Sequence, residues 1–419
     1  MTTAPPSLAD LVRVFGRIGL LSFGGPAAQI ALMHRELVEG RTWLTEEQFL
    51  RALSFCMLLP GPEAMQLATY AGWRLRGVAG GLIGGLLFVV PGALVIAALA
   101  LLYGAYGELP LVEAAFVGVK ATVVVIVLQA LWRLGRKALK TPSRWMLAGL
   151  SFAGIFALDL PFPLIILAAG IYGAWSAQPS DVPPPPLPAA RLARTLAVWG
   201  GLWLAPIAAL WAAGPQFLTD LALFFAKLAV VTFGGAYAVL AYMTQTVVSE
   251  KGWIDTEQMI DALGLAETTP GPLILVTQFV GMLAGAAQGG AGLALAAGAL
   301  VLWVTFVPCF LWIFLGAPYV DWIAGRPRLS GALSAITAAV VGVILNLSVW
   351  FAAHVFFNTV GTATIGPVTM IRPALEGFDA RAALLCVAAA LALMWRRWPL
   401  PAVLALAAVS GALTGLATV

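Results

Sequence analysis

Long apolar stretches separated by short polar loops make up almost the whole chain of 419 residues. Most stretches have the roughly 20 residues that cross about 30 Å of hydrocarbon, and the alternating ten-residue pattern of barrel strands does not occur. Because helices satisfy their own backbone hydrogen bonds inside a bilayer, the pattern predicts an all-α polytopic membrane protein. The predicted elements number about thirteen and span 8–34, 46–74, 77–106, 109–135, 144–159, 161–177, 192–213, 216–248, 257–287, 289–318, 329–353, 380–395 and 399–419.

The chain also contains an internal repeat. Over residues 15–62, 16 of 48 positions are identical to those found 210 residues later, and further along the offset becomes 217. The repeat predicts four parts, namely a first repeat at 1–177, a Pro-rich linker at 178–191, an unpaired transmembrane helix at 192–213 and a second repeat at 214–419. The matching pairs include Phe23-Gly24-Gly25 and Phe233-Gly234-Gly235, Trp43 and Trp253, Glu47-Gln48 and Glu257-Gln258, and Pro60-Gly61-Pro62 and Pro270-Gly271-Pro272.

The unpaired helix predicts that the two repeats have inverted topology, because an odd number of crossings separates equivalent elements. With the amino terminus in the cytoplasm, fourteen basic loop residues lie inside and four outside, which satisfies the positive-inside rule and puts the carboxyl terminus in the periplasm. The inner set is Arg74, Arg76, Arg133, Arg136, Lys137, Lys140, Arg144, Arg191, Arg194, Lys251, Arg326, Arg328, Arg396 and Arg397, and the outer set is Arg35, Arg41, Arg372 and Arg381. The elements that bear the repeated motifs are either full spans or re-entrant hairpins. If both motif-bearing elements of a repeat are hairpins instead of full spans, the number of membrane crossings between the repeats stays odd.

Composition agrees with this class of protein. Hydrophobic residues make up 61% of the chain, charged residues 10%, and the mean hydropathy is +0.95, which leaves too few polar residues to cover a soluble surface. The net charge of +4 lies in short loop clusters that suit a membrane face, and a nucleic-acid partner has no support. Three scattered cysteines and two lone histidines supply neither a metal site nor a nucleophile with its base, so no cofactor and no enzyme activity are expected.

The repeated glycine and proline motifs predict breaks in membrane helices. A break frees N–H groups at the start of the next half-helix, where the positive end of the helix dipole favours an anion. Alternatively, the glycines serve close helix contacts and the prolines only kink a helix. The predicted substrate-binding residues at the breaks are Ser22, Gly24, Gly25, Pro60, Gly61, Pro62, Thr232, Gly234, Gly235, Thr269, Pro270, Gly271 and Pro272.

Charged residues inside the spans are the remaining candidates, because such charges are costly and usually functional. Arg17 and Lys227 occupy equivalent repeat positions seven residues before the first glycine, and Lys120 lies within the fourth span, so all three are predicted to bind substrate. Glu63 and Glu267 flank the proline motifs. Burial disfavours the charged form of a carboxyl group, so both are candidate proton carriers. The alternative is that these carboxylates pair with the three cations.

The motifs from Ser22 to Pro26, from Trp43 to Gln48 and from Leu59 to Pro62, with their second copies, resemble those of the chromate transporter family in its long, two-repeat form. The resemblance covers nearly the whole chain. It implies export of chromate across the bacterial inner membrane, driven by the proton motive force or the membrane potential. The implied partners are chromate or a related oxyanion and the lipid bilayer, and a homodimer is compatible with this class.

Three questions stay open at this point. Sulfate is a tetrahedral dianion of similar size, so the motifs do not separate a chromate carrier from a carrier of sulfate or another oxyanion. An anion channel is the second alternative, which saturable flux against a gradient would exclude. The repeats differ at Pro26/Ala236, Glu63/Leu273 and Met57/Glu267, so the sequence does not tell which half carries a proton.

Overall fold

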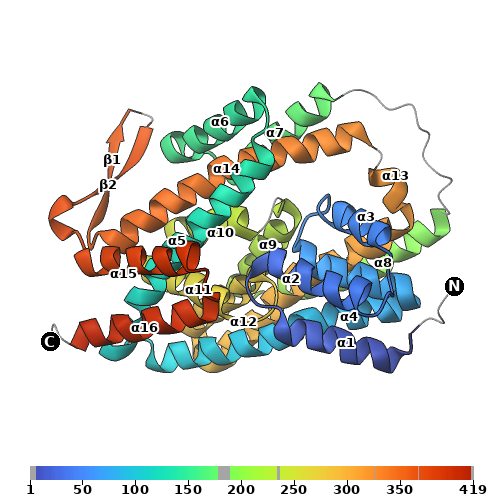
Figure 1. Cartoon of the computed structure of the whole chain (residues 1–419), viewed down its shortest axis with the longest axis horizontal. Helices are drawn as coiled ribbons and strands as arrows, with labels where there is room; N and C mark the ends of the chain where they lie inside the picture. The colour runs from blue at the N-terminus through green and yellow to red at the C-terminus, as the bar shows by residue number, and fades with distance from the viewer. Residues whose placement is uncertain (1–5, 178–188, 234–235, 325, 367, 417–419) are drawn as a thin grey trace. The chain divides into compact units, whose positions relative to one another are not determined.

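The computed structural model describes residues 6–177, 189–233, 236–324, 326–366 and 368–416 (Figure 1). The prediction of an all-α polytopic membrane protein is confirmed. Among the described residues, five helices are long and apolar enough to cross a membrane, at 63–106, 110–138, 190–213, 273–319 and 327–356.

The helices and strands have the following bounds: α1 Leu8–Leu21, α2 Gly25–His34, η1 Arg35–Glu39, α3 Glu46–Cys56, α4 Glu63–Tyr106, α5 Pro110–Ala138, α6 Pro142–Leu158, α7 Phe162–Ser176, α8 Ala189–Ala213, α9 Gln216–Val231, α10 Ala236–Thr244, η2 Gln245–Glu250, α11 Thr256–Thr268, η3 Leu273–Leu275, α12 Val276–Gly316, η4 Ala317–Tyr319, α13 Val320–Ala324, α14 Pro327–Phe356, β1 Val360–Ile365, β2 Val368–Pro373, η5 Leu375–Gly377, α15 Ala380–Ala390, η6 Leu391–Trp395 and α16 Leu400–Leu416.

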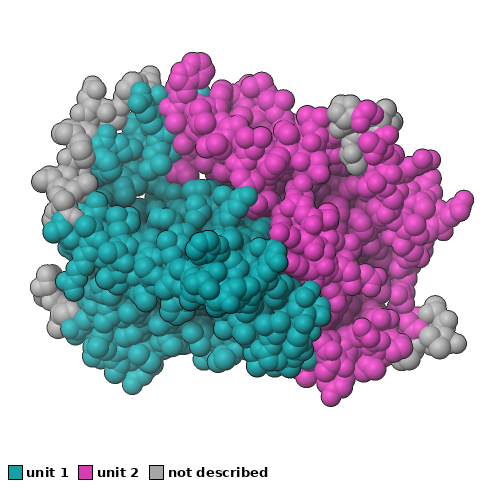
Figure 2. All heavy atoms as spheres, turned by 180° about the vertical axis from the view of Figure 1, so that it is seen from behind, with its two compact units in different colours: residues 1–101, 176–236, 269–330 teal, residues 102–175, 237–268, 331–419 magenta. Residues whose placement is uncertain are grey.

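The chain divides into two compact units, each drawing on both halves of the sequence (Figure 2). Unit 1 comprises residues 1–101, 176–236 and 269–330, and unit 2 comprises 102–175, 237–268 and 331–419. Within unit 1, α12 packs against α8 and α9, and α1 lies along α4. Within unit 2, α5 packs against α11, α15 and α16. The two sequence repeats therefore do not fold as separate bodies.

The two longest helices each fold back on themselves at a kink. In α4 the backbone leaves helical geometry at Arg76 and Gly77, and in α12 it does so at Gly289 and Gly290, next to the predicted element boundaries. The two arms of α4 pack tightly, because a Cβ on Gly72 would fall only 2.1 Å from a carbonyl oxygen of the opposite arm. The arm that follows each proline motif is therefore a short helix of about four turns.

Local structure recurs at the spacing of the sequence repeat. Each copy has a π-helical turn, at Arg35–Glu39 and at Gln245–Glu250. Each also has a capping arrangement in which a glutamine at 48 or 258 bonds the backbone before its helix. A basic side chain lies over a tryptophan in both copies, with Arg41 5.9 Å from Trp43 and Lys251 5.8 Å from Trp253. Several repeated residues thus serve caps and loop packing.

A β-hairpin of β1 and β2 occupies a stretch that the sequence analysis left as a loop. The strands pair antiparallel from Val360 with Pro373 to Ile365 with Val368, and Gly366 at the turn has a φ of 61°. A turn of this kind favours glycine because its left-handed backbone strains other residues. The hairpin belongs to unit 2 and contributes to the wall of a pocket described below.

Candidate functional site

The first helix break lies between α1 and α2 in unit 1. Ser22 ends α1 with its hydroxyl donating to the Ile18 carbonyl at 2.6 Å, and the side chain is fully buried. Gly24 then turns the chain with a φ of 85°, in the left-handed region that only glycine enters without strain, and α2 starts at Gly25. The predicted break is present.

In the second copy, α9 ends at Val231 and α10 begins at Ala236. Thr232 donates its hydroxyl to the Leu228 carbonyl at 2.6 Å and is 2% exposed. Gly234 and Gly235, which the sequence predicts at this break, lie outside the described residues. Because the hydroxyls of Ser22 and Thr232 both donate to their own helices, these side chains end helices and do not offer donors to a ligand in this conformation.

Each break meets the proline motif of the opposite copy. The Gly271 N–H donates to the Ser22 carbonyl at 2.9 Å, and the Gly61 N–H donates to the Thr232 carbonyl at 2.8 Å. The two hydrogen bonds join equivalent pairs of positions, since Ser22 corresponds to Thr232 and Gly61 to Gly271. Unit 1 therefore brings the end of α1, the end of α9 and both proline motifs together in one two-fold-like arrangement.

The proline motifs are closely packed at this junction. Gly61 and Gly271 have φ values of 117° and 91°, and a Cβ on Gly61 would fall 2.9 Å from the sulfur of Cys309. Pro270 lies against α4, where a Cβ on Gly92 would come within 2.2 Å of its carbonyl oxygen. Thr269, which precedes this motif, is buried. The junction has little room for any larger residue at these positions.

The start of α2 is the more open part of the junction. Its first turn has no side-chain cap, and apart from the chain neighbours of Gly25 and the backbone of its own helix no described heavy atom lies within 4 Å of the place where a Cβ on Gly25 would stand. Uncapped N–H groups at a helix start attract anions, since the helix dipole adds positive charge there. The geometry supplies an uncapped helix start with open space beside Gly25.

A second feature of the junction is a small pocket of about 20 Å³, room for about one water molecule. Gln29 lines it with its side chain 1% exposed, and Glu63, the first residue of α4, is a second polar residue of its wall. The remaining lining residues are Pro26, Pro62, Ala64, Pro272, Leu273 and Ile274. Both copies of the proline motif thus line one small pocket.

Arg17 and Lys227 lie near the breaks on exposed helix faces. The Arg17 side chain is 61% exposed and forms an ion pair of 3.7 Å with Glu36 on η1, and Glu36 also pairs with Arg41. Lys227 is exposed on α9. Each remains a proposed contact for substrate. The sequence analysis did not predict Glu36 as the partner of Arg17.

Lys120 belongs to unit 2 and is not part of the junction. Its ammonium lies 3.2 Å from the Asp261 carboxylate, and the Tyr103 hydroxyl donates to the other carboxylate oxygen at 2.7 Å. Asp261 is 5% exposed, so the pair is held away from solvent by α4, α5 and α11. The structure thus places Lys120 in a buried ion pair with a carboxylate that the sequence analysis did not single out.

Glu267 also belongs to unit 2, whereas Glu63 belongs to unit 1. The Tyr237 hydroxyl donates to the Glu267 carboxylate at 2.6 Å, and the side chain is 7% exposed. Tyr237 follows the second glycine break by two residues. Glu267 therefore sits beside the segment that leads out of the second break.

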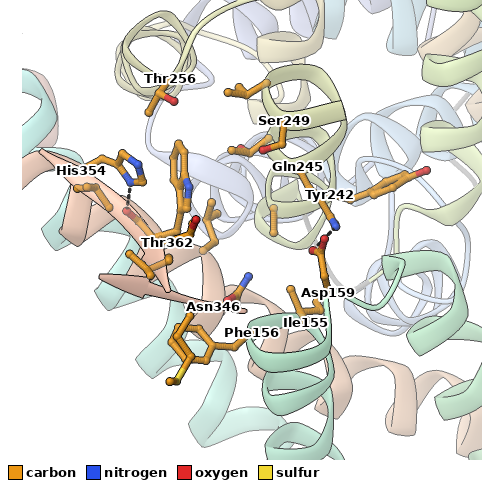
Figure 3. Close-up of a pocket in the computed structure, with 18 of the residues that line it drawn as sticks. Ile155, Phe156, Asp159, Tyr242, Gln245, Ser249, Thr256, Asn346, His354 and Thr362 are labelled. Atoms are coloured by element: carbon orange, nitrogen blue, oxygen red, sulfur yellow. Dashed lines mark hydrogen bonds between the residues drawn. The ribbon is translucent and has the colours of Figure 1, made fainter. Parts of the chain in front are cut away.

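Unit 2 contains a larger pocket of about 350 Å³ (Figure 3). The Gln245 amide donates to the Asp159 carboxylate at 2.6 Å on one side, and His354 and Thr362 lie on the other side. His354 hydrogen-bonds the Trp350 carbonyl at 2.8 Å. Residues of η2 and of the β1–β2 hairpin line this pocket together.

Sequence reasoning missed Gln29, Asp261, Tyr103 and Tyr237 as members of these clusters. A usable signal existed for two of them, because Gln29 and Asp261 are polar residues inside otherwise apolar segments, and such residues usually have a partner or a function. Tyr103 and Tyr237 carry no comparable signal, since tyrosines are common near the ends of membrane helices.

Helix breaks that meet among long apolar helices are typical of multi-pass membrane transporters built with discontinuous helices. The chain belongs to the chromate transporter family. The family model matches residues 9–174 and again residues 219–412.

Three relatives named for chromate transport each match most of the chain. A probable chromate transport protein of Synechococcus elongatus is 33% identical over 340 residues, which cover 81% of this chain and 83% of that protein. A chromate transport protein of Cupriavidus metallidurans is 31% identical over 379 residues, 88% of each chain. One of Pseudomonas aeruginosa is 32% identical over 345 residues, 81% and 80% of the two chains. No solved structure matches the chain.

Proposed function

We propose that this protein is a secondary carrier that exports chromate from the bacterial cytoplasm across the inner membrane. The observation that carries the proposal is the crossed pairing of the four helix breaks, in which Ser22 bonds Gly271 and Thr232 bonds Gly61. In transporters, broken helices that meet near the bilayer midplane form the substrate site, and irregular backbone at membrane depth must be buried in protein or line a watery cavity. The relatives named for chromate transport support the choice of substrate.

The anion would bind in front of the α2 N-terminus, where Gly24 and Gly25 leave the backbone accessible. Its equivalents in the second copy are Gly234 and Gly235. A tetrahedral dianion matches several N–H donors at once, and Arg17 and Lys227 would supply compensating charge. The same chemistry accepts sulfate, so competition measurements decide the selectivity.

We further propose that the motif-bearing segments are re-entrant hairpins. In the second copy, Gln245 bonds Asp159, which lies in the loop between α6 and α7 that the charge distribution assigns to the periplasm. Asp261 bonds Tyr103, three residues before the periplasmic end of α4. Full spans would put Gln245 and Asp261 near the cytoplasmic face instead, so both contacts support a hairpin that enters from the periplasm.

Contacts within unit 1 support the mirror-image arrangement for the first copy. The Phe55 and Tyr70 ring centroids lie 6.2 Å apart. The Phe55 ring also packs against Gly316, since a Cβ on Gly316 would fall 2.7 Å from the Phe55 ring. Gly316 ends α12 next to the loop assigned to the cytoplasm, and α3 packs against α13 in that loop. A straight span through the break would place Phe55 well away from this face.

The hairpin arrangement also improves the charge distribution. It moves Arg35 and Arg41 to the cytoplasmic side and Lys251 to the periplasmic side, so fifteen of the eighteen basic loop residues lie inside instead of fourteen. Hairpins that enter from opposite faces meet at their tips, as the paired breaks do. The tips would then separate the two aqueous sides at one shared site, which alternating access requires.

We propose that the proton motive force drives export and that Glu63 and Glu267 carry the coupled protons. A dianion leaving an inside-negative cell already gains about 2.3 kcal/mol per charge per 100 mV, so export without protons is thermodynamically allowed. The carboxylate of Glu63 at the start of α4 lies close to the junction, and a dianion arriving there would favour its protonation. Anion release and proton entry would then be linked.

The cations give the first test of the proposal. Arg17→Gln or Lys227→Gln is expected to weaken the apparent affinity for chromate at least ten-fold, because a hydrogen bond to a charged group contributes about 1.5–3 kcal/mol. Labelled chromate uptake into inside-out vesicles measures this. Arg13→Gln is the matched control, since Arg13 lies one turn earlier on α1 with its side chain 80% exposed. Normal affinity in both variants would mean that Arg17 and Lys227 only pair with carboxylates.

A further inference from the structure

Gln29 connects the two copies at the junction and leaves one polar atom without a partner. Its amide nitrogen donates to the Gly271 carbonyl at 2.7 Å and to the Ser22 carbonyl at 3.3 Å. These two bonds fix the orientation of the amide, because both acceptors are carbonyl oxygens. The amide oxygen is buried and accepts no hydrogen bond from any described residue.

The walls of the small pocket explain why this oxygen lacks a backbone donor. Three helical segments begin at or next to the pocket, yet Pro26, Pro62 and Pro272 stand in its wall at those starts, and proline has no N–H. The other polar side chain of the wall is Glu63. A carboxyl group that carries a proton is a donor, whereas a carboxylate is not.

The comparison between the two copies indicates that Gln29 and Glu63 act together. Their equivalents 210 residues later are Val239 and Leu273, both buried and apolar. Both polar residues thus occur in the first copy, and both apolar ones in the second. If Gln29 and Glu63 had unrelated structural roles, nothing would require both positions to be polar in the first copy and apolar in the second.

We propose that Gln29 is the hydrogen-bond partner of the protonated Glu63 carboxyl, so that the small pocket is a proton-binding site. Glu63 takes a proton from solution, and its O–H donates to the Gln29 amide oxygen directly or through one water. Because the same amide holds Gly271 and Ser22, protonation would strengthen the contact between the two copies. Gln29 is a positioning residue, and its role as a coupling element rests on the proposed transport function.

Few other titratable groups face this pair in the described part of unit 1. Cys56 on α3 lies close enough to sense the Glu63 charge, and Cys309 on α12 lies beside Gly61. On α2, His34 lies at the far end of the helix and pairs with Glu39 and Glu46. The η3 segment carries no charged residue. Glu63 is therefore the group to which the proposal assigns the proton.

The test measures the protonated carboxyl of purified protein by infrared difference spectroscopy over a pH titration without chromate. The Glu63 carboxyl should contribute a band to the wild-type spectrum that Glu63→Gln lacks, while bands of other carboxyl groups such as Glu267 remain. In Gln29→Leu the band should shift, and its midpoint should move down by about one pH unit, because loss of the acceptor disfavours the protonated form. Gln29→Met serves as a second apolar variant if the leucine variant does not fold.

Gln278→Leu is the matched control. Gln278 is also buried, donates to the Ala93 carbonyl at 3.1 Å and has an unpartnered amide oxygen, but it does not line the pocket. Its variant should leave band and midpoint unchanged. An unaltered titration in the Gln29 variants, an equal shift in Gln278→Leu, or a Glu63→Gln spectrum identical to that of the wild type would overturn the proposal. Absence of chromate transport by wild-type protein whose band titrates as expected would refute only the transport function.

Discussion

Gly24→Val is expected to abolish chromate binding and transport while the protein still folds into the membrane. Gly24 has a φ of 85°, a region that a β-branched residue enters only with strain of about 1–3 kcal/mol, and it caps the helix whose N–H groups face the proposed anion. A valine there would displace the first turn of α2 from the junction. Calorimetry on purified, folded protein measures the loss of binding directly.

Gly16→Val is the control for the effect of replacing a glycine by a valine near the first break. Gly16 lies on α1 eight residues earlier, and no described heavy atom stands within 4 Å of the place of its Cβ. This variant should bind chromate normally. Gly234→Val is expected to match Gly24→Val because it occupies the equivalent repeat position. Unchanged affinity in either variant would make that break a structural element and the anion site asymmetric.

An all-or-none result is expected from the accessibility of single cysteines at Thr42 and Ser249. The variants are made in a background without native cysteines and labelled with a membrane-impermeant thiol reagent. Thr42→Cys should react from the same side of the membrane as Thr141→Cys, because a hairpin returns the chain to the face that it entered. Ser249→Cys should react from the same side as Asn358→Cys. All four positions lie in loops or at helix ends.

The two reference positions make this comparison independent of absolute orientation. Thr141 and Asn358 lie on opposite faces whether the motif segments are hairpins or full spans. Full spans predict the reverse result, with Thr42→Cys reacting like Asn358→Cys and Ser249→Cys like Thr141→Cys. That pattern would contradict the hairpin arrangement and would leave the contacts of Gln245 and Asp261 unexplained.

The helix breaks could be predicted from sequence because glycine and proline act locally. Gly24 adopts the left-handed backbone that its residue type favours, and the proline motifs separate α3 from α4 and α11 from η3. The crossed pairing of Gly61 with Thr232 and of Gly271 with Ser22 could not be predicted. It joins segments about 170 and 250 residues apart, and helical periodicity carries no information about which helix faces which.

The charged residues show the same limit. The sequence marks Lys120 as a buried cation but does not identify Asp261 as its partner, because that contact depends on the packing of α5 against α11. It also names Glu63 and Glu267 together as candidate proton carriers, whereas they fall in different units with different neighbours. The β-hairpin was missed because its strands are short and lie among polar loop residues.

The most direct test of the account is the uptake of labelled chromate into inside-out membrane vesicles that contain this protein. With a proton gradient imposed at zero membrane potential, the account predicts saturable uptake that proceeds against the chromate gradient, with sulfate, molybdate and phosphate as competitors that define selectivity. Flux that does not saturate and stops at equal concentrations would indicate a channel. Absence of chromate uptake under every driving force would contradict the proposed function itself.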